Sequence, residues 1–498
     1  MRTLALLIAA GGASNAWAML DARSVLRGSN RRLSTANFEE IKLAAADAAA
    51  DDQFGISVAI DGDTVVIGAP GAGTGGAVYV LRTSDGGATY DEVAKLTAAD
   101  AAADDWFGYS VAINGDTIVV GAHWDDGYTG SVYVFRTTDS GATYGQVAKL
   151  TASDAAADDQ FGGSVAIDGN TIVVGAYGKV DSTGAVYVFR TSDGGATYDE
   201  VAKLTASDAA ADDYFGYSMV MDGATIVVGA FGGEAAYVFR TTDGGATYGQ
   251  VAKLTSSDAG CSCVDGGGAY FGYSVAIDGA SVVVGAHYVS VNGSPGSGAA
   301  YVFRTSDGGA TYGQVAELTA SDATTFDYLG TSVAIDGDTI VVGAKGGWAS
   351  GPGSVYVFRT TDGGAMYGQV AKLTASDGAA EDAFGISVAI DGSTIMVGSW
   401  QDSHDGGAYS GSAYVFSPPA PTAQPTPRPT FQPTTPQPTT SPQPTMSPKP
   451  TPQPTTPQPT PQPTTPAPST AALESDSATR AGTLATVLGV VAATALAL

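Results

Sequence analysis

The stretch that decides the fold of this 498-residue chain is FGYSVAINGDTIVVGA, residues 107–122. In it, two short β-branched segments flank an Asn-Gly pair, a pattern typical of two strands joined by a tight hairpin. The Phe-Gly pair at its start recurs every 53 to 58 residues, with Leu329-Gly330 taking its place once. The other copies are Phe54-Gly55, Phe161-Gly162, Phe215-Gly216, Phe271-Gly272 and Phe384-Gly385. Most of the chain is therefore seven copies of one unit.

Each unit contains four short apolar segments, which in the second copy read SVAIN, DTIVVGA, SVYVFR and QVAKLTA. They are bounded by Gly and Asp and show no helical periodicity, so we interpret them as strands. Asp-Gly or Asn-Gly joins the first two strands of every unit and predicts a type I′ turn. The seventh unit stops at Phe416 without a fourth strand, and residues 38–43 (FEEIKL) supply one. The sequence thus predicts an all-β, seven-bladed β-propeller closed by an N-terminal strand.

Two motifs in the repeat resemble known families. The segment Thr83–Tyr90, T-x-D-x-G-x-T-Y, is similar to the Asp-box of sialidases, in which the Asp braces a turn. Phe54-Gly55 together with Val66–Pro70 resembles the FG-GAP repeat of the integrin α N-terminal propeller, and this likeness covers residues 38–416. The resemblance implies that these residues pack between blades and do not bind ligand.

The resemblance does not extend to calcium. Several integrin blades hold calcium in a D-x-D-x-D-G loop between strands one and two, whereas each connection here is a two-residue turn. Calcium takes six to eight oxygen ligands, which so short a turn does not offer. We therefore expect no cofactor; the acidic loops that precede each Phe-Gly pair, such as residues 154–159, are the one place that leaves calcium open.

The two ends of the chain read as targeting segments. Residues 1–18 form a signal peptide ending in Ala16-Trp17-Ala18, and residues 19–37 are a leader or linker. Residues 417–470 are rich in Pro, Thr and Gln and predict a disordered, polyproline-like stalk open to O-glycosylation. Residues 471–498 end in an apolar run and favour a GPI signal, with a short transmembrane helix as the alternative. The candidate attachment sites are Ser469 and Ser475, which would place the protein on the extracellular face of the plasma membrane.

Charge and cysteine content exclude several classes of protein. Lys and Arg total 22 against 50 Asp and Glu, and a net charge of −28 excludes a nucleic-acid binder driven by its overall charge. The two cysteines, Cys261 and Cys263, are too few for a disulfide scaffold or a cysteine zinc site. They are candidates for a C-x-C disulfide or for a link between two chains. Asn292 begins an Asn-Gly-Ser sequon and is a candidate for N-glycosylation.

The seven units differ most in the loops between strands two and three, the 2–3 loops. These loops hold all three histidines and most of the tryptophans, on the face that the loops between blades (the 4–1 loops) should share. Aromatic and polar residues on one rim suit sugar stacking or protein recognition, although aromatics that simply cover the channel mouth would explain them equally. The histidines lie in three separate blades, too dispersed to predict a metal site. The candidate rim residues are His123, Trp124, Asp125, Asp126, Tyr177, His287, Tyr288, Trp348, Trp400, Asp402 and His404.

Enzymatic motifs are missing from the sequence. A sialidase needs an arginine cluster around its pocket, but the arginines here repeat at the end of strand three, as at Arg82 and Arg136, which indicates a structural role. No nucleophile elbow, phosphate loop or HExxH motif occurs. We therefore expect no enzyme but a cell-surface adhesion or recognition protein, with a propeller on a glycosylated stalk and an extracellular protein or glycan as partner. A glycan-binding lectin and a structural coat protein without a specific ligand remain open alternatives.

Overall fold

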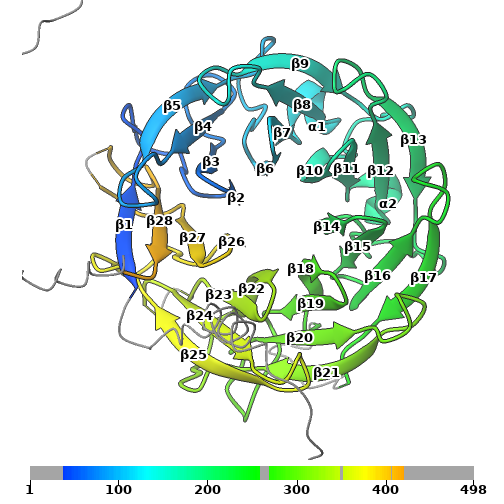
Figure 1. Ribbon diagram of the computed structural model, residues 1–498, viewed down its shortest axis with the longest axis vertical. Helices are drawn as coiled ribbons and strands as arrows, with labels where there is room; N and C mark the ends of the chain where they lie inside the picture. The colour runs from blue at the N-terminus through cyan, green and yellow to red at the C-terminus, as the bar shows by residue number, and fades with distance from the viewer. Residues whose placement is uncertain (1–37, 258–267, 348–350, 405, 420–498) are drawn as a thin grey trace, which may run out of the picture. The chain divides into compact units, whose positions relative to one another are not determined.

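The computed structural model describes residues 38–257, 268–347, 351–404 and 406–419, and Figure 1 shows them as a ring of blades around a central channel. They form seven four-stranded antiparallel sheets, which confirms the predicted seven-bladed propeller. The predicted signal peptide, leader, stalk and C-terminal signal lie outside the described residues. So do five candidate residues: Cys261, Cys263, Trp348, Ser469 and Ser475.

The strands follow the four predicted segments of each unit. The innermost strands are β2 (Val58–Asp61), β6 (Ser110–Asn114), β10 (Phe161–Asp168), β14 (Ser218–Asp222), β18 (Phe271–Asp278), β22 (Leu329–Asp336) and β26 (Val388–Asp391). The second strands are β3 (Thr64–Ala69), β7 (Thr117–Ala122), β11 (Thr171–Ala176), β15 (Thr225–Ala230), β19 (Ser281–Ala286), β23 (Thr339–Ala344) and β27 (Thr394–Ser399). The third strands are β4 (Ala77–Arg82), β8 (Ser131–Arg136), β12 (Ala185–Arg190), β16 (Ala235–Arg240), β20 (Ala299–Arg304), β24 (Ser354–Thr360) and β28 (Ser412–Ser417). The outer strands are β5 (Asp91–Leu96), β9 (Gly145–Leu150), β13 (Asp199–Leu204), β17 (Gly249–Leu254), β21 (Gly313–Leu318), β25 (Tyr367–Leu373) and β1 (Glu39–Leu43).

Among the described residues, helix is confined to two four-residue turns in 2–3 loops, α1 (Asp125–Tyr128) and α2 (Lys179–Ser182). Within the described ranges, no helix is long and apolar enough to cross a membrane.

The N-terminal strand completes the last blade, as predicted. Strand β1 pairs with β28 over five residues, with Ile41 opposite Val415, so that the fourth sheet position of blade seven comes from the start of the chain. The Lys42 ammonium adds ion pairs to Asp377 at 2.5 Å and to Asp402 at 2.7 Å. The described ring therefore has no blade that lacks its outer strand.

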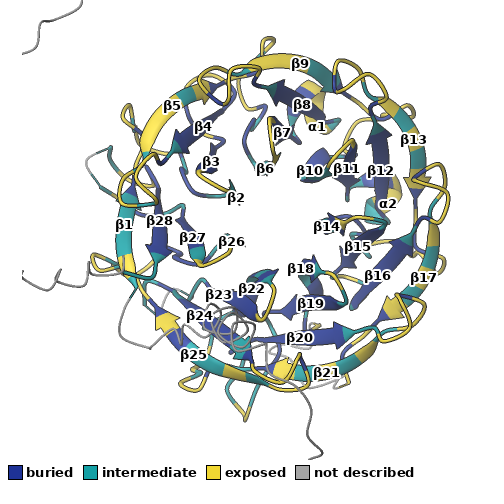
Figure 2. Ribbon diagram, in the orientation of Figure 1, coloured by how far each residue is buried: buried dark blue, intermediate teal, exposed yellow. Residues whose placement is uncertain are grey.

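The hydrophobic core lies between neighbouring blades. In Figure 2 the second and third strands are mostly buried, while the outer strands are mostly exposed or partly buried and end in a buried leucine, such as Leu150 of β9. The Phe of each Phe-Gly pair is buried in this layer; Phe54, for example, packs edge-on against Tyr79 with ring centroids 5.3 Å apart. The Phe54 cluster also contains Leu43 and Met396, so it joins the last blade to the first.

Glycines of the repeat allow the blades to approach each other closely. A Cβ added to Gly68, in the second strand of blade one, would lie 1.9 Å from the Gly108 carbonyl oxygen of the next blade. The Ser57 hydroxyl donates to the same oxygen at 2.9 Å, and an equivalent serine bond links every pair of blades around the ring. The Phe-Gly and Gly-Ala residues thus have the packing role that the resemblance implied.

The turn between the first two strands differs from its prediction. Asp61 pairs with Thr64 as the last residue of β2, so the two-residue loop is Gly62-Asp63. Gly62 has φ +56° whereas Asp63 has no positive φ, which is the pattern of a type II′ turn; type I′, which needs two positive φ values, is wrong. The Asp61 carboxylate instead accepts the backbone N–H of Gly115 in the next blade. Equivalent bonds, one of them accepted by the Asn114 amide oxygen instead of an Asp carboxylate, link all seven first turns in a ring.

The Asp-box acts as a turn brace. The Asp85 carboxylate accepts the backbone N–H of Thr89 and of Ala88 at 2.9 Å each, and the Thr89 hydroxyl at 2.8 Å. Bonds from the Thr89 backbone and hydroxyl, followed by the Thr83 hydroxyl, lower the pKa of Asp85 to about 2. The Arg82 guanidinium donates to the Ser140 carbonyl in the Asp-box of the next blade, and Arg136, Arg190 and Arg240 repeat this contact. These arginines are structural.

Candidate ligand-binding face

The 2–3 loops and the 4–1 loops form one face of the propeller, as expected, and hydrogen-bond to each other. The backbone N–H of Gln160 donates to the Tyr128 carbonyl at 2.8 Å, and that of Phe161 donates to the Thr129 carbonyl at 3.0 Å. The residue before each Phe-Gly or Leu-Gly pair has a left-handed backbone, with φ between 54° and 59°. These seven residues are Gln53, Trp106, Gln160, Tyr214, Tyr270, Tyr328 and Ala383.

Two further positions in each blade vary while their neighbours repeat. One follows the second strand directly and is Pro70, His123, Tyr177, Phe231, His287, Lys345 or Trp400. The other follows the Phe-Gly or Leu-Gly pair, lines the channel, and is Ile56, Tyr109, Gly163, Tyr217, Tyr273, Thr331 or Ile386. The same backbone positions therefore present different chemistry in different blades.

Rings from these positions, together with Trp124 and Tyr288, form a continuous chain of contacts, which we term the aromatic arc. Successive ring centroids lie between 3.9 and 6.5 Å apart, a range that includes favourable edge-to-face and offset contacts. The hydroxyls of Tyr217 and Tyr273 are also hydrogen-bonded to each other at 3.0 Å. In order of contact, the arc consists of Trp124, Trp106, Tyr109, His123, Tyr177, Tyr217, Tyr273, His287, Tyr288 and Tyr328.

The two histidines of the arc are buried and uncharged. His123 is 2% exposed and His287 is 3% exposed, and the Nδ1 atom of each has no hydrogen-bond partner. Burial lowers the pKa of both imidazoles to about 3, and the nearby Lys345 charge contributes at His287. At neutral pH these rings therefore act as aromatic packing groups.

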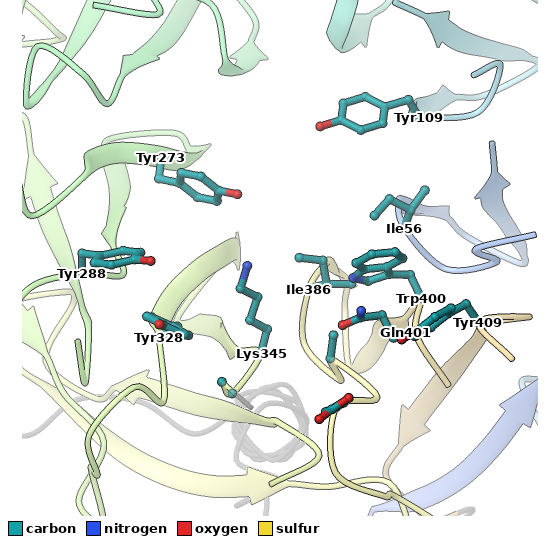
Figure 3. A pocket seen from close by; sticks show the side chains of 14 residues that line it. Ile56, Tyr109, Tyr273, Tyr288, Tyr328, Lys345, Ile386, Trp400, Gln401 and Tyr409 are labelled. Atoms are coloured by element: carbon teal, nitrogen blue, oxygen red, sulfur yellow. The ribbon is translucent and has the colours of Figure 1, made fainter. Parts of the chain in front are cut away.

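A cavity of about 430 Å³ lies at the blade-six end of the arc (Figure 3). Tyr288 and Tyr328 line one side of it, and Trp400 and Tyr409 of blade seven line another. Lys345 projects between these groups, with its Nζ 5.9 Å from the centroid of the Tyr328 ring. Burial lowers the pKa of this lysine. A volume of this size is in the range of small-molecule sites.

The structure divides the predicted rim residues into groups. His123, Trp124, Tyr177 and His287 belong to the aromatic arc, Trp400 lines the cavity, and Tyr288 belongs to both. Asp126 is exposed on α1, outside the arc and the cavity.

Two predicted rim carboxylates are engaged in structural ion pairs. Asp125 is buried and lies 2.7 Å from the Lys149 ammonium, and its carboxylate also accepts the Tyr133 hydroxyl at 3.2 Å. Asp402 pairs in the same way with Lys42.

His404 is engaged within its own loop, where its Nε2 lies 2.7 Å from the Gly411 carbonyl oxygen.

The site also contains residues that were not among the predicted candidates, including Trp106, Tyr109, Tyr217, Tyr273, Tyr328 and Lys345. Three of them follow a Phe-Gly pair, in a segment that otherwise repeats. The sequence did offer a signal for these three residues, because the single position after the Phe-Gly pair varies between units while its neighbours repeat. The loops vary in the same way but over several residues.

The opposite face is built from the repeated turns. Among the residues that the structure describes, no group of three or more His, Cys, Asp or Glu side chains is placed to hold a metal ion. The carboxylates at the channel mouth on this side are bonded to backbone N–H groups of the next blade.

Fold and repeat together define the class of protein as a seven-bladed β-propeller built from tandem repeats. The family model that matches is the FG-GAP repeat, and the chain belongs to this family. Comparison with curated proteins gives no match. The family model matches residues 38–81, 90–135, 144–189, 198–248, 248–303, 312–358 and 367–416.

Proposed function

We propose that this protein is a cell-surface recognition protein whose propeller binds an extracellular ligand on the face that carries the aromatic arc. The observation that carries the proposal is the arc itself, ten rings in sequential contact that end at a cavity of about 430 Å³. Aromatic side chains supply large contact area at a small entropic cost, which is why they are enriched at recognition sites.

The contrast between the two faces supports this choice. On the opposite face the turns repeat from blade to blade, and their side chains are used in bonds to neighbouring turns. The blades differ most on the arc face, and a ligand that binds at one place on the ring requires such differences. The arginines that a sialidase would need are bonded to backbone carbonyls, so we propose binding without catalysis.

The location of the protein is part of the proposal. A signal peptide, a Pro- and Thr-rich stalk and a C-terminal GPI signal would carry the propeller to the outside of the cell and hold it away from the membrane. Adhesion is one use of such a display.

Glycan binding is the second candidate function. Flat aromatic surfaces next to polar groups are found at the cavity, where Trp400 and Tyr288 lie with Gln401 and Lys345. Sugar rings present apolar faces to such surfaces and hydroxyls to such polar groups. The coat-protein alternative has no equivalent observation in its favour.

The full chain should be screened against an array of glycans and an array of extracellular proteins. We expect binding that Trp400→Ala and Tyr288→Ala each reduce at least about tenfold, as removal of a buried aromatic at an interface typically does. Met366→Ala is the matched control, because Met366 is 73% exposed in the sixth Asp-box turn on the opposite face. Binding that the two arc-face variants leave unchanged, or that the control reduces as much as they do, would refute the proposal.

A further inference from the structure

Lys345 differs from every other lysine that the structure describes. The other seven each have an Asp carboxylate within 2.5 to 2.7 Å of the ammonium nitrogen. Lys345 has no such partner among the described residues, although the whole chain carries 50 Asp and Glu and a net charge of −28. The paired lysines are Lys42, Lys95, Lys149, Lys179, Lys203, Lys253 and Lys372.

The ammonium of Lys345 is directed into the cavity. Figure 3 shows its nitrogen pointing between Tyr273 and Ile386, away from its own backbone. Its nitrogen lies 5.9 Å from the centroid of the Tyr328 ring. The carboxylate that also lines the cavity, Glu381, is exposed and forms no ion pair with Lys345. A cation held in this way lacks the counter-charge that the chain supplies to all its other described lysines.

The surroundings of Lys345 indicate what would supply that charge. The cavity has aromatic side chains on two sides, Tyr288 and Tyr328 on one and Trp400 on the other, and the Gln401 amide lies beside Trp400. One lysine matches one carboxylate, and the flat rings match the apolar face of a sugar. An acidic polypeptide fits less well, because its several negative charges would meet a chain of net charge −28.

We propose that this cavity binds a carboxylate-bearing sugar of an extracellular glycan, with the carboxylate on the Lys345 ammonium and the ring against Trp400 and Tyr288. This rests on the proposed function, since it names the class of ligand that the arc face recognises. Lys345 is the residue that sets the specificity for acidic over neutral sugars.

The test compares oligosaccharides that end in a uronate or a sialate with their carboxyl-reduced forms. Binding of each to the full chain is measured by calorimetry. We expect the wild type to bind at least one acidic member about tenfold more tightly than its reduced form, as a hydrogen bond to a charged group implies. Lys345→Met should remove this preference and leave the affinity for the reduced form within about twofold, whereas Lys345→Arg should retain the preference. Equal melting temperatures for the three proteins show that each is folded.

Other results would overturn the role of Lys345, the class of ligand or the proposed function. If Lys345→Met keeps the preference for the acidic sugar, or if the wild type has none, the role of Lys345 is overturned. If acidic peptides bind in a Lys345-dependent way and no saccharide does, the ligand class is overturned but recognition by this face stands. If neither array of the previous section contains a ligand that depends on Trp400 or Tyr288, both this inference and the proposed function fail.

Discussion

Leu43→Ala tests whether the N-terminal strand closes the ring in solution. Leu43 ends β1, is 5% exposed, and packs in the cluster that joins the last blade to the first. Leu96 ends β5 and is its structural equivalent: it is also 5% exposed and lies opposite Val78, as Leu43 lies opposite Ala413. The two leucines differ in one respect, because Leu96 belongs to the same stretch of chain as its blade, whereas Leu43 comes from the far end.

The expected loss of unfolding free energy follows from the structural equivalence of Leu43 and Leu96. Truncation of a buried leucine to alanine costs about 2–5 kcal/mol of unfolding free energy, depending on how far the site collapses. If β1 is docked as the structure has it, Leu43→Ala and Leu96→Ala should lose similar amounts, within about 1 kcal/mol of each other. Deletion of residues 38–43 should cost more, because it also removes the β1–β28 pairing and leaves an open strand edge.

Urea denaturation of the wild type and the three variants, followed by far-UV circular dichroism, measures these differences. The closure would be refuted by a loss below about 1 kcal/mol in Leu43→Ala together with a loss of about 2–5 kcal/mol in Leu96→Ala. A truncated protein that unfolds at the same urea concentration as the full chain would refute it equally.

Three further predictions concern acid, calcium and attachment. His123 and His287 have pKa values of about 3 when folded and about 6.5 when unfolded, so the unfolded chain binds more protons between these values and stability falls as pH drops below about 6.5. Replacing both by Phe should flatten this dependence by up to about 1.4 kcal/mol per pH unit for each histidine, as read from urea midpoints at pH 7 and pH 5. EDTA should change the melting temperature by less than about 2 °C, since the first turns are two-residue hairpins; a larger loss would locate calcium in the acidic 4–1 loops. A phosphatidylinositol-specific phospholipase should release the protein from cells, and peptides from residues 484–498 in the mature, membrane-bound form would contradict the GPI signal.

The fold was predictable because independent features of the repeat agree with one another. Seven tight-turn pairs set the hairpins, and an incomplete last unit required a strand that residues 38–43 could supply. The turn type was not predictable in the same way. Asp61 was interpreted from its tolerance of positive φ, but its carboxylate bonds to Gly115 of the next blade. Periodicity along one chain does not show which residues of neighbouring units meet.

The candidate site was predictable in its face but not in its members. Loop variation pointed to residues such as Trp124, Tyr288 and Trp400, and the structure places them in the arc or at the cavity; their role in binding stays a prediction. From the sequence, Asp125 was a candidate ligand-binding carboxylate. Its carboxylate is instead paired with Lys149 from the outer strand of the same blade, and this pairing arises from the tertiary structure, which the sequence pattern does not show. Lys345 is the opposite case: the sequence did not single it out, and it stands out in the structure because it has no carboxylate partner among the described residues.

The asymmetry of the aromatic arc explains why the cavity lies where it does. The arc runs through blades two to six, where the position after the Phe-Gly or Leu-Gly pair includes Tyr109, Tyr217 and Tyr273. In blades seven and one the same position is Ile386 and Ile56, whose side chains carry no ring or hydroxyl and line the cavity wall. A ligand entering here would therefore meet rings on one side, aliphatic groups on another and one ammonium group between them. A propeller made of identical repeats could not create such a site. The differences at single positions therefore confine ligand binding to one part of this symmetric fold.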